Sequence, residues 1–259
     1  MNIKSKIVLA LLATSSAAFA QTAPAAPEVT YNVGVVSQYR YRGIAQTKGD
    51  AALQGGADYA NANGFYAGAW GSTIKWIKDA AGTAGETKGP VELDLYGGYK
   101  FEAAGLGFDV GYLRYQYLGN TLKNSTATPA GPYVNANTDE AYGAVTAGPA
   151  TLKYSYAFSD LFGNVNSKGS TYWDLSATFD LGNGYSLVPH VGRQVVKNSS
   201  PSVSYTDVAL TLNKDLGEGL SASVAAISTS GNTTAFTNLS STGYNAAKSA
   251  LVVGVKYAF

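Results

Sequence analysis

The sequence has no cysteine, one histidine and no methionine beyond the initiator. Without cysteine there can be no disulfide framework and no thiolate metal site. A single histidine also argues against zinc, which normally takes several His or Cys ligands. Charged residues form only 14% of the chain, with 18 basic against 17 acidic residues, so the composition gives no basic surface for nucleic acid. We therefore predict no metal ion, no other cofactor and no nucleic-acid partner.

Long apolar runs are absent as well. After residue 20 no stretch approaches the roughly 18 consecutive apolar residues that indicate a transmembrane helix. This excludes a helical membrane protein. Only a closed β-barrel could then cross a bilayer, because lipid cannot satisfy the unpaired edge of an open sheet.

The first 20 residues predict an export signal that is removed from the mature protein. They comprise the basic Lys4 and Lys6, an apolar stretch at 7–13 and the small-x-small site Ala18-Phe19-Ala20. The apolar stretch is about half of what a membrane-spanning helix needs. Cleavage leaves 16 basic and 17 acidic residues, an Ala/Pro-rich leader at 21–27 and one predicted domain at 28–259.

Side chains alternate between apolar and polar along most of the mature chain. In the last nine residues the odd positions from Leu251 to Phe259 are apolar or aromatic, and the even positions include Gly254 and Lys256. Such a pattern predicts a strand with two different faces. A strand that ends the chain on an aromatic residue resembles the C-terminal signal of bacterial outer-membrane proteins. That resemblance implies recognition by the barrel-assembly machinery through Phe259.

Twelve segments of about ten residues follow the same rule, the length expected of a tilted membrane strand. In the first of them, Tyr31, Val33, Val35, Tyr39 and Tyr41 share the apolar face. The segments are 29–42, 50–60, 65–75, 91–101, 105–117, 139–147, 150–160, 170–181, 184–195, 204–214, 218–228 and 248–259.

Short and long connections alternate strictly between these segments. The short ones lie at 61–64, 102–104, 148–149, 182–183 and 215–217, and the long ones are rich in Gly, Asn, Ser and Thr. Bacterial barrels place short turns on the periplasmic side and long loops outside the cell. The sequence therefore predicts an all-β fold, a transmembrane antiparallel up-and-down β-barrel of about 12 strands. A soluble secreted β-sandwich is the alternative fold. A sandwich would not need the aromatic residues that the predicted strands carry on their apolar faces.

Several motifs in the first third of the mature chain resemble the TorF-type porin family. They are Ser37-Gln38-Tyr39-Arg40-Tyr41-Arg42-Gly43-Ile44 with Gln46, Gln54-Gly55-Gly56-Ala57-Asp58-Tyr59, the segment 64–72 and Glu92-Leu93-Asp94-Leu95-Tyr96-Gly97-Gly98-Tyr99. Beyond residue 105 the likeness rests on the rhythm of the strands. The resemblance implies a channel in the bacterial outer membrane and sets no substrate.

Charged residues on the polar faces are predicted to line the pore. Arg40 and Arg42 fall near the outer end of the first segment, and Glu92 and Asp94 near the outer end of the fourth. They could form a mixed-charge constriction that selects solutes, or a salt-bridged plug that closes the barrel. Both readings stay open. The predicted pore-lining residues are Arg40, Arg42, Asp58, Glu92, Asp94, Lys100, Lys153, Asp174 and Lys256, with Asp109 and His190 as further inward candidates.

The leading functional hypothesis is an outer-membrane channel for small polar solutes or ions, in contact with outer-membrane lipid and without enzymatic activity. A second is a structural or adhesive barrel that binds ligands through its long loops. A third is a lipid-modifying enzyme, with His190, Asp174 and either Ser176 or Ser186 as a catalytic triad. No sequence feature places a serine beside His190, so the enzyme is the weakest of the three.

Overall fold

The computed structural model describes residues 27–80, 88–125, 133–199, 202–238 and 243–259. The predicted export signal and almost all of the predicted leader lie outside them. Neither helix in this part of the chain is long and apolar enough to cross a membrane. The strands are β1 (Glu28–Val36), β2 (Arg40–Tyr41), β3 (Ile44–Ala45), β4 (Ala52–Ala60), β5 (Phe65–Thr73), β6 (Val91–Ala103), β7 (Leu106–Leu118), β8 (Thr138–Ala147), β9 (Ala150–Ala157), β10 (Thr171–Ala177), β11 (Phe179–Gly182), β12 (Tyr185–Val195), β13 (Tyr205–Gly217), β14 (Leu220–Thr229) and β15 (Ala250–Ala258), and the helices are α1 (Trp76–Asp79), α2 (Thr233–Asn238) and the 3₁₀ turn η1 (Leu122–Asn124).

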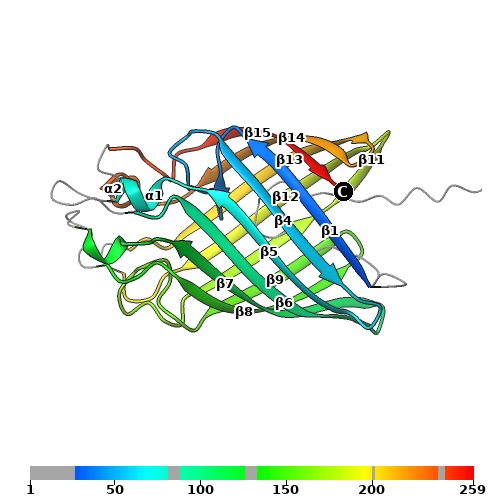
Figure 1. Ribbon diagram of the computed structural model, residues 1–259, viewed down its shortest axis with the longest axis horizontal. Helices are drawn as coiled ribbons and strands as arrows, with labels where there is room; N and C mark the ends of the chain where they lie inside the picture. Colours follow the sequence, from blue (N-terminus) through cyan, green and yellow to red (C-terminus); the bar gives the residue numbers. More distant parts are fainter. Residues whose placement is uncertain (1–26, 81–87, 126–132, 200–201, 239–242) are drawn as a thin grey trace, which may run out of the picture.

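The strands form one antiparallel sheet that closes on itself. Its order is β10-β9-β8-β7-β6-β5-β4-β1-β15-β14-β13-β12-β11, and a further pairing of β10 with β12 closes the circle. β10 and β11 follow each other along β12 and are separated only by Thr178, so together they make one barrel strand. The result is a closed twelve-stranded barrel, as the sequence predicts. Its strands are tilted, with the short turns and the C-terminus at one end and the long loops with α1 and α2 at the other (Figure 1).

The predicted alternation decides which side chains face outward. Leu210, Leu251 and Val253 are exposed, whereas their neighbours Ala209 and Gly254 are buried. Exposed apolar residues cover the outer wall, which is the arrangement that lipid stabilises and water does not. Aromatic side chains encircle the turn end of the barrel, with stacked pairs at Phe101–Phe108 and Tyr31–Phe259 and a tilted pair at Phe65–Tyr99.

The short connections are tighter than predicted. Ala104–Gly105, Asn183–Gly184 and Glu218–Gly219 are two-residue turns in which both residues have positive φ, from 51° to 82°. Such turns match the twist of antiparallel strands. The strands therefore run two to three residues past some predicted ends, so β6 reaches Ala103 and β13 reaches Gly217.

The first predicted strand is wrong in its second half. The barrel strand β1 ends at Val36, and the chain then bends into the barrel and forms the short hairpin β2–β3. Arg42 (φ 45°) and Gly43 (φ 76°) make its turn, a geometry that hairpins favour and that lets the chain reverse at once. Tyr39 and Tyr41, predicted on the lipid face, are consequently buried inside the barrel.

Glycines on the inner wall make room for tyrosine rings. Tyr66, Gly98, Gly111 and Tyr142 are register neighbours on β5 to β8, and the two rings lean inward over the two glycines until their hydroxyls touch. A β-carbon on Gly111 would lie 2.5 Å from the hydroxyl oxygen of Tyr142. At these positions glycine leaves the space that an inward tyrosine ring fills, which explains why the chain uses both residues.

Gly111→Ala should therefore destabilise the barrel, whereas Gly143→Ala should not. The alanine methyl at 111 would displace the Tyr142 ring at a cost of about 1 to 3 kcal/mol. At Gly143 a β-carbon would meet nothing within 4 Å. Urea unfolding of both variants in lipid vesicles measures the difference, and equal unfolding midpoints would contradict this packing.

Candidate functional site: the barrel lumen

The outer half of the lumen is occupied by residues 39–47, which we call the inner hairpin. Tyr39, Arg40, Tyr41 and Arg42 are between 2% and 7% exposed. The hairpin tip presses against the wall at β13 and β14, since a β-carbon on Gly43 would lie 2.6 Å from a methyl carbon of Thr229 and 2.7 Å from the β-carbon of Asp207. Glycine is therefore required here both by its positive φ and by the close approach.

Arg40 fastens one side of the hairpin to the outer loops. Its Nη1 donates to the carbonyl oxygens of Gly43 at 2.8 Å and Lys248 at 2.7 Å, and its Nε donates to Gln38 Oε1 at 3.0 Å. Burial lowers the pKa of Arg40. The sequence predicted Arg40 on the barrel wall facing the pore, and that placement is wrong because the chain has already left the wall at Val36.

Arg42 fastens the tip of the hairpin to the barrel wall. Its guanidinium donates to both carboxylate oxygens of Glu140, at 3.0 and 2.7 Å, and to Gln194 Oε1 at 2.8 Å. It also lies over the rings of Tyr41 and Tyr172, at 4.9 and 4.2 Å from the centroids. Burial disfavours its charge, but the attraction of Glu140, its hydrogen bond and the nearby tyrosine hydroxyls together outweigh this and hold the pKa of Arg42 well above its usual value.

Glu92 and Asp94 lie on the inner face of β6, as the alternation implies, but they are not the ion-pair partners of the arginines. Glu92 accepts a hydrogen bond from the Tyr39 hydroxyl at 2.6 Å. Asp94 has one buried oxygen that no described protein donor reaches. Glu140 on β8 forms the ion pair instead. The sequence reasoning did not select Glu140, although its position opposite the apolar Ala141 face of its segment could have indicated it.

His190 lies between two carboxylates on the inner wall. Its Nε2 is 2.7 Å from Asp174 Oδ2, and its Nδ1 is 3.4 Å from Asp207 Oδ2. The Tyr172 hydroxyl donates to Asp207 at 3.0 Å. In a catalytic triad one ring nitrogen faces the serine and only the other faces an acid. The observed geometry, with a carboxylate at each nitrogen, differs from that arrangement.

Except for Asp174, which lies nearer the long loops, the remaining predicted residues line the half of the lumen nearer the short turns. Asp58, Asp109 and Lys256 are partly buried on the inner faces of β4, β7 and β15. Lys100 is the register partner of Asp109, and Lys153 is the register partner of Asp174. All of these side chains point inward, whereas Arg40 and Arg42 reach the lumen through the inner hairpin. The structure thus places two polar regions in series inside the barrel.

One protein family, described as a bacterial protein of unknown function (Gcw_chp), has a model that matches residues 20–259. The chain belongs to the Gcw_chp family. No curated protein matches the chain in sequence.

Two solved structures show what the Gcw_chp barrel is similar to. The KdgM porin in complex with disordered oligogalacturonate is 9% identical, with a TM-score of 0.52, over 89% of this chain and 98% of that one. The NanC porin is 11% identical, with a TM-score of 0.52, over 89% of this chain and 99% of that one. At these identities the likeness establishes the fold, which is that of an outer-membrane porin.

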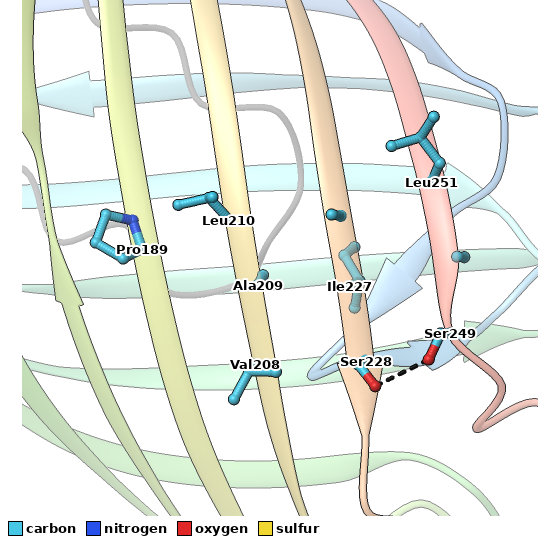
Figure 2. Close-up of a pocket in the computed structure, with 10 residues that line it drawn as sticks. Pro189, Val208, Ala209, Leu210, Ile227, Ser228, Ser249 and Leu251 are labelled. Carbon is cyan, nitrogen blue, oxygen red and sulfur yellow. Dashed lines mark hydrogen bonds between the residues drawn. The ribbon is translucent and has the colours of Figure 1, made fainter.

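A groove of about 730 Å³ on the Gcw_chp barrel lies on the outer wall, away from the lumen. Leu210, Ala226 and Leu251 are register neighbours on β13, β14 and β15, so the small Ala226 leaves a hollow between two leucines. Figure 2 shows Leu210 and Leu251 on either side of it, with the Ser228–Ser249 hydrogen bond at one end. The rim of this groove consists mainly of exposed apolar side chains.

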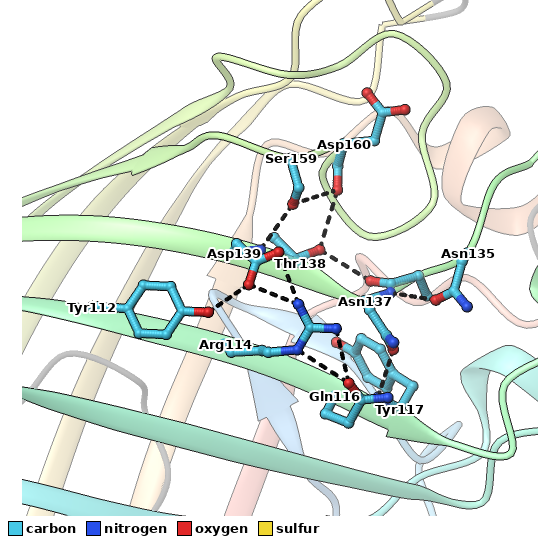
Figure 3. A network of polar contacts seen from close by, with 11 residues as sticks. Tyr112, Arg114, Gln116, Tyr117, Asn135, Asn137, Thr138, Asp139, Ser159 and Asp160 are labelled. Carbon is cyan, nitrogen blue, oxygen red and sulfur yellow. Dashed lines mark hydrogen bonds and ion pairs between the residues drawn. The ribbon is translucent and has the colours of Figure 1, made fainter.

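A second outward feature of the Gcw_chp barrel is a polar network toward the loop ends of β7 and β8. Arg114 on β7 donates to both oxygens of Asp139 on β8, at 2.8 and 2.9 Å, and to Gln116 at 3.0 Å (Figure 3). Tyr112 donates to the same aspartate at 2.6 Å. An exposed ion pair of this kind is compatible with lipid head groups but not with hydrocarbon.

Proposed function

We propose that the protein is an outer-membrane channel for small polar solutes or ions, narrowed in its outer half by the inner hairpin. The observation that carries this proposal is the contrast between the two faces of the wall. The outer face is covered by exposed apolar side chains, and the inner face carries most of the charged residues of the strands. A barrel of 12 strands lies between small filled barrels and wide aqueous porins, which favours a narrow path.

The charges inside the barrel favour cations over anions. Among the described inner-face residues that are at least partly buried, seven carboxylates face five basic groups, and the acidic excess persists even if His190 is protonated. Rings of one charge set ion selectivity in narrow pores. The carboxylates are Asp58, Glu92, Asp94, Asp109, Glu140, Asp174 and Asp207, and the basic residues are Arg40, Arg42, Lys100, Lys153 and Lys256.

Refolded protein in a planar bilayer tests both parts of this proposal. We expect discrete conductance steps and, in a potassium chloride gradient, a reversal potential of the sign that cation preference requires. The Asp58→Asn and Asp109→Asn double variant should weaken that preference, since it removes the acidic excess of two. Conductance with anion preference in the unmodified protein would contradict the charge argument.

A structural barrel closed by the inner hairpin is the second candidate. The observation that favours it is the burial of the Arg42–Glu140 pair, whose side chains are 4% and 3% exposed. Under this alternative, correctly folded protein would show no conductance steps. Its long outer loops would then be the functional part, as binding surfaces for ligands outside the cell.

We also propose that the chain is exported by its first 20 residues and assembled through its last strand. In support, Phe259 is 65% exposed on the outer wall, where it stacks on Tyr31 and Tyr257. The resemblance to TorF-type porins also implies a channel in the bacterial outer membrane. Removal of Phe259 tests the assembly signal, and unchanged amounts of protein in the outer membrane would contradict it.

A further inference from the structure

Three inward tyrosines, Tyr66, Tyr96 and Tyr142, form what we call the tyrosine belt. Each ring leans over a glycine of a neighbouring strand. A β-carbon on Gly68 would lie 2.5 to 2.7 Å from three atoms of Tyr96, and Gly111 is as close to Tyr142. One face of each ring is therefore pressed along the wall. The other face is left toward the lumen.

Carboxylates accept hydrogen bonds from two of the three hydroxyls of the tyrosine belt, and the Tyr142 hydroxyl lies against that of Tyr66. Tyr66 donates to Asp109 Oδ1 at 2.6 Å, and Tyr96 donates to Asp58 in a shorter contact. These bonds fix the rings in position and place negative charge at their edges. An aromatic face with an acid beside it attracts cations, because the ring quadrupole and the carboxylate act in the same direction.

The chain's own lysines already occupy faces of the tyrosine belt. Lys153 Nζ lies 3.9 Å from the centroid of Tyr142, and Lys100 Nζ lies 5.0 Å from that of Tyr66. A lysine loses considerable side-chain freedom when it is held in one place. A small solute with an ammonium group could make the same contact with Tyr142 and release Lys153. The lysines thus indicate the chemistry that the belt recognises.

We propose that the tyrosine belt binds solutes that carry an ammonium group, with the solute cation replacing Lys153 on the face of Tyr142. The inference rests on the proposed channel only for the route by which a solute reaches the belt. Binding itself can be measured in detergent micelles, where no conduction is needed. The belt then acts as a transient binding region below the inner hairpin.

The test is an NMR titration of the refolded mature chain, with labelled tyrosine, using choline and its neutral carbon isostere dimethylbutanol. Choline should shift the ring signals of Tyr142 and Tyr66 saturably and bind about tenfold more tightly than the isostere. The outward-facing Tyr156, which is 40% exposed, serves as the internal control. Equal binding of the two probes would overturn the proposal.

Two pairs of variants separate recognition from folding. Tyr142→Leu should weaken choline binding by about tenfold, whereas Tyr156→Leu should leave it unchanged. Lys153→Met should tighten choline binding because it removes the internal competitor, and by more than Lys256→Met, which removes the same charge elsewhere in the lumen. If Tyr142→Leu does not fold, the comparison of choline binding by Lys153→Met and Lys256→Met tests the proposal by itself. No difference between Lys153→Met and Lys256→Met would overturn the proposal.

The same protein in a planar bilayer distinguishes this inference from the proposed function. Choline binding without any conductance would support the ammonium site at the tyrosine belt and contradict the channel. Conductance of potassium without choline binding would support the channel and contradict the ammonium site.

Discussion

Replacing residues 38–47 with a short Gly-Ser linker should raise the single-channel conductance severalfold. The inner hairpin fills the outer half of the lumen, and its residues are almost wholly buried there. Its removal takes away the aromatic and guanidinium groups that narrow the path and leaves the twelve strands of the wall unchanged. Planar-bilayer recording of the variant beside the unmodified protein measures the change.

Two controls accompany the hairpin replacement. Heat-modifiable migration in detergent shows whether the variant still forms a closed barrel. The same linker inserted between Asn198 and Ser199, in an outer loop, should leave the conductance as it is. A folded hairpin variant with unaltered conductance would mean that the hairpin does not obstruct the path.

Arg42→Ala should destabilise the protein by about 3 to 5 kcal/mol, because it leaves the Glu140 carboxylate buried without its partner. Arg114→Ala is the matched control. It breaks an arginine–aspartate pair whose side chains are 35% and 19% exposed, against 4% and 3% for Arg42 and Glu140. An exposed pair contributes about 0 to 1 kcal/mol. Urea unfolding in lipid vesicles compares the two variants.

A double variant shows that the cost at Arg42 comes from the unpaired charge. Arg42→Met combined with Glu140→Leu should regain much of the stability that Arg42→Ala loses, since it removes both charges and keeps apolar volume. Similar losses for Arg42→Ala and Arg114→Ala would contradict a buried, structurally important ion pair.

The barrel could be predicted because its signals are local. Period-two alternation, as in residues 251–259, and turn residues such as Asn183 and Gly148 act over a few positions. A strand exposed to lipid on one face must alternate, so the pattern survives in the sequence. The strand number and the alternation of long and short connections follow from those signals.

The inner hairpin could not be predicted in the same way. Residues 39–42 resume the alternation of β1 after the interruption at Val36 and Ser37, and tyrosine suits both a lipid interface and a packed interior. What separates the two is the turn at Arg42–Gly43 and the partners Glu140 and Gln194, which lie about 100 and 150 positions further along the chain. Gly43 was the one local signal of a reversal.

The central claim is that one face of the wall meets lipid and the other encloses a separate path, and the three tryptophans allow a direct test. Trp173 is 48% exposed on the outer wall, and Trp70 packs inside the barrel against Tyr39. Two variants each keep one of them, with Trp76 and the other tryptophan replaced by phenylalanine. In vesicles of lipid brominated along the acyl chains, we predict strong fluorescence quenching of Trp173 and little quenching of Trp70. Equal quenching of the two would contradict the account.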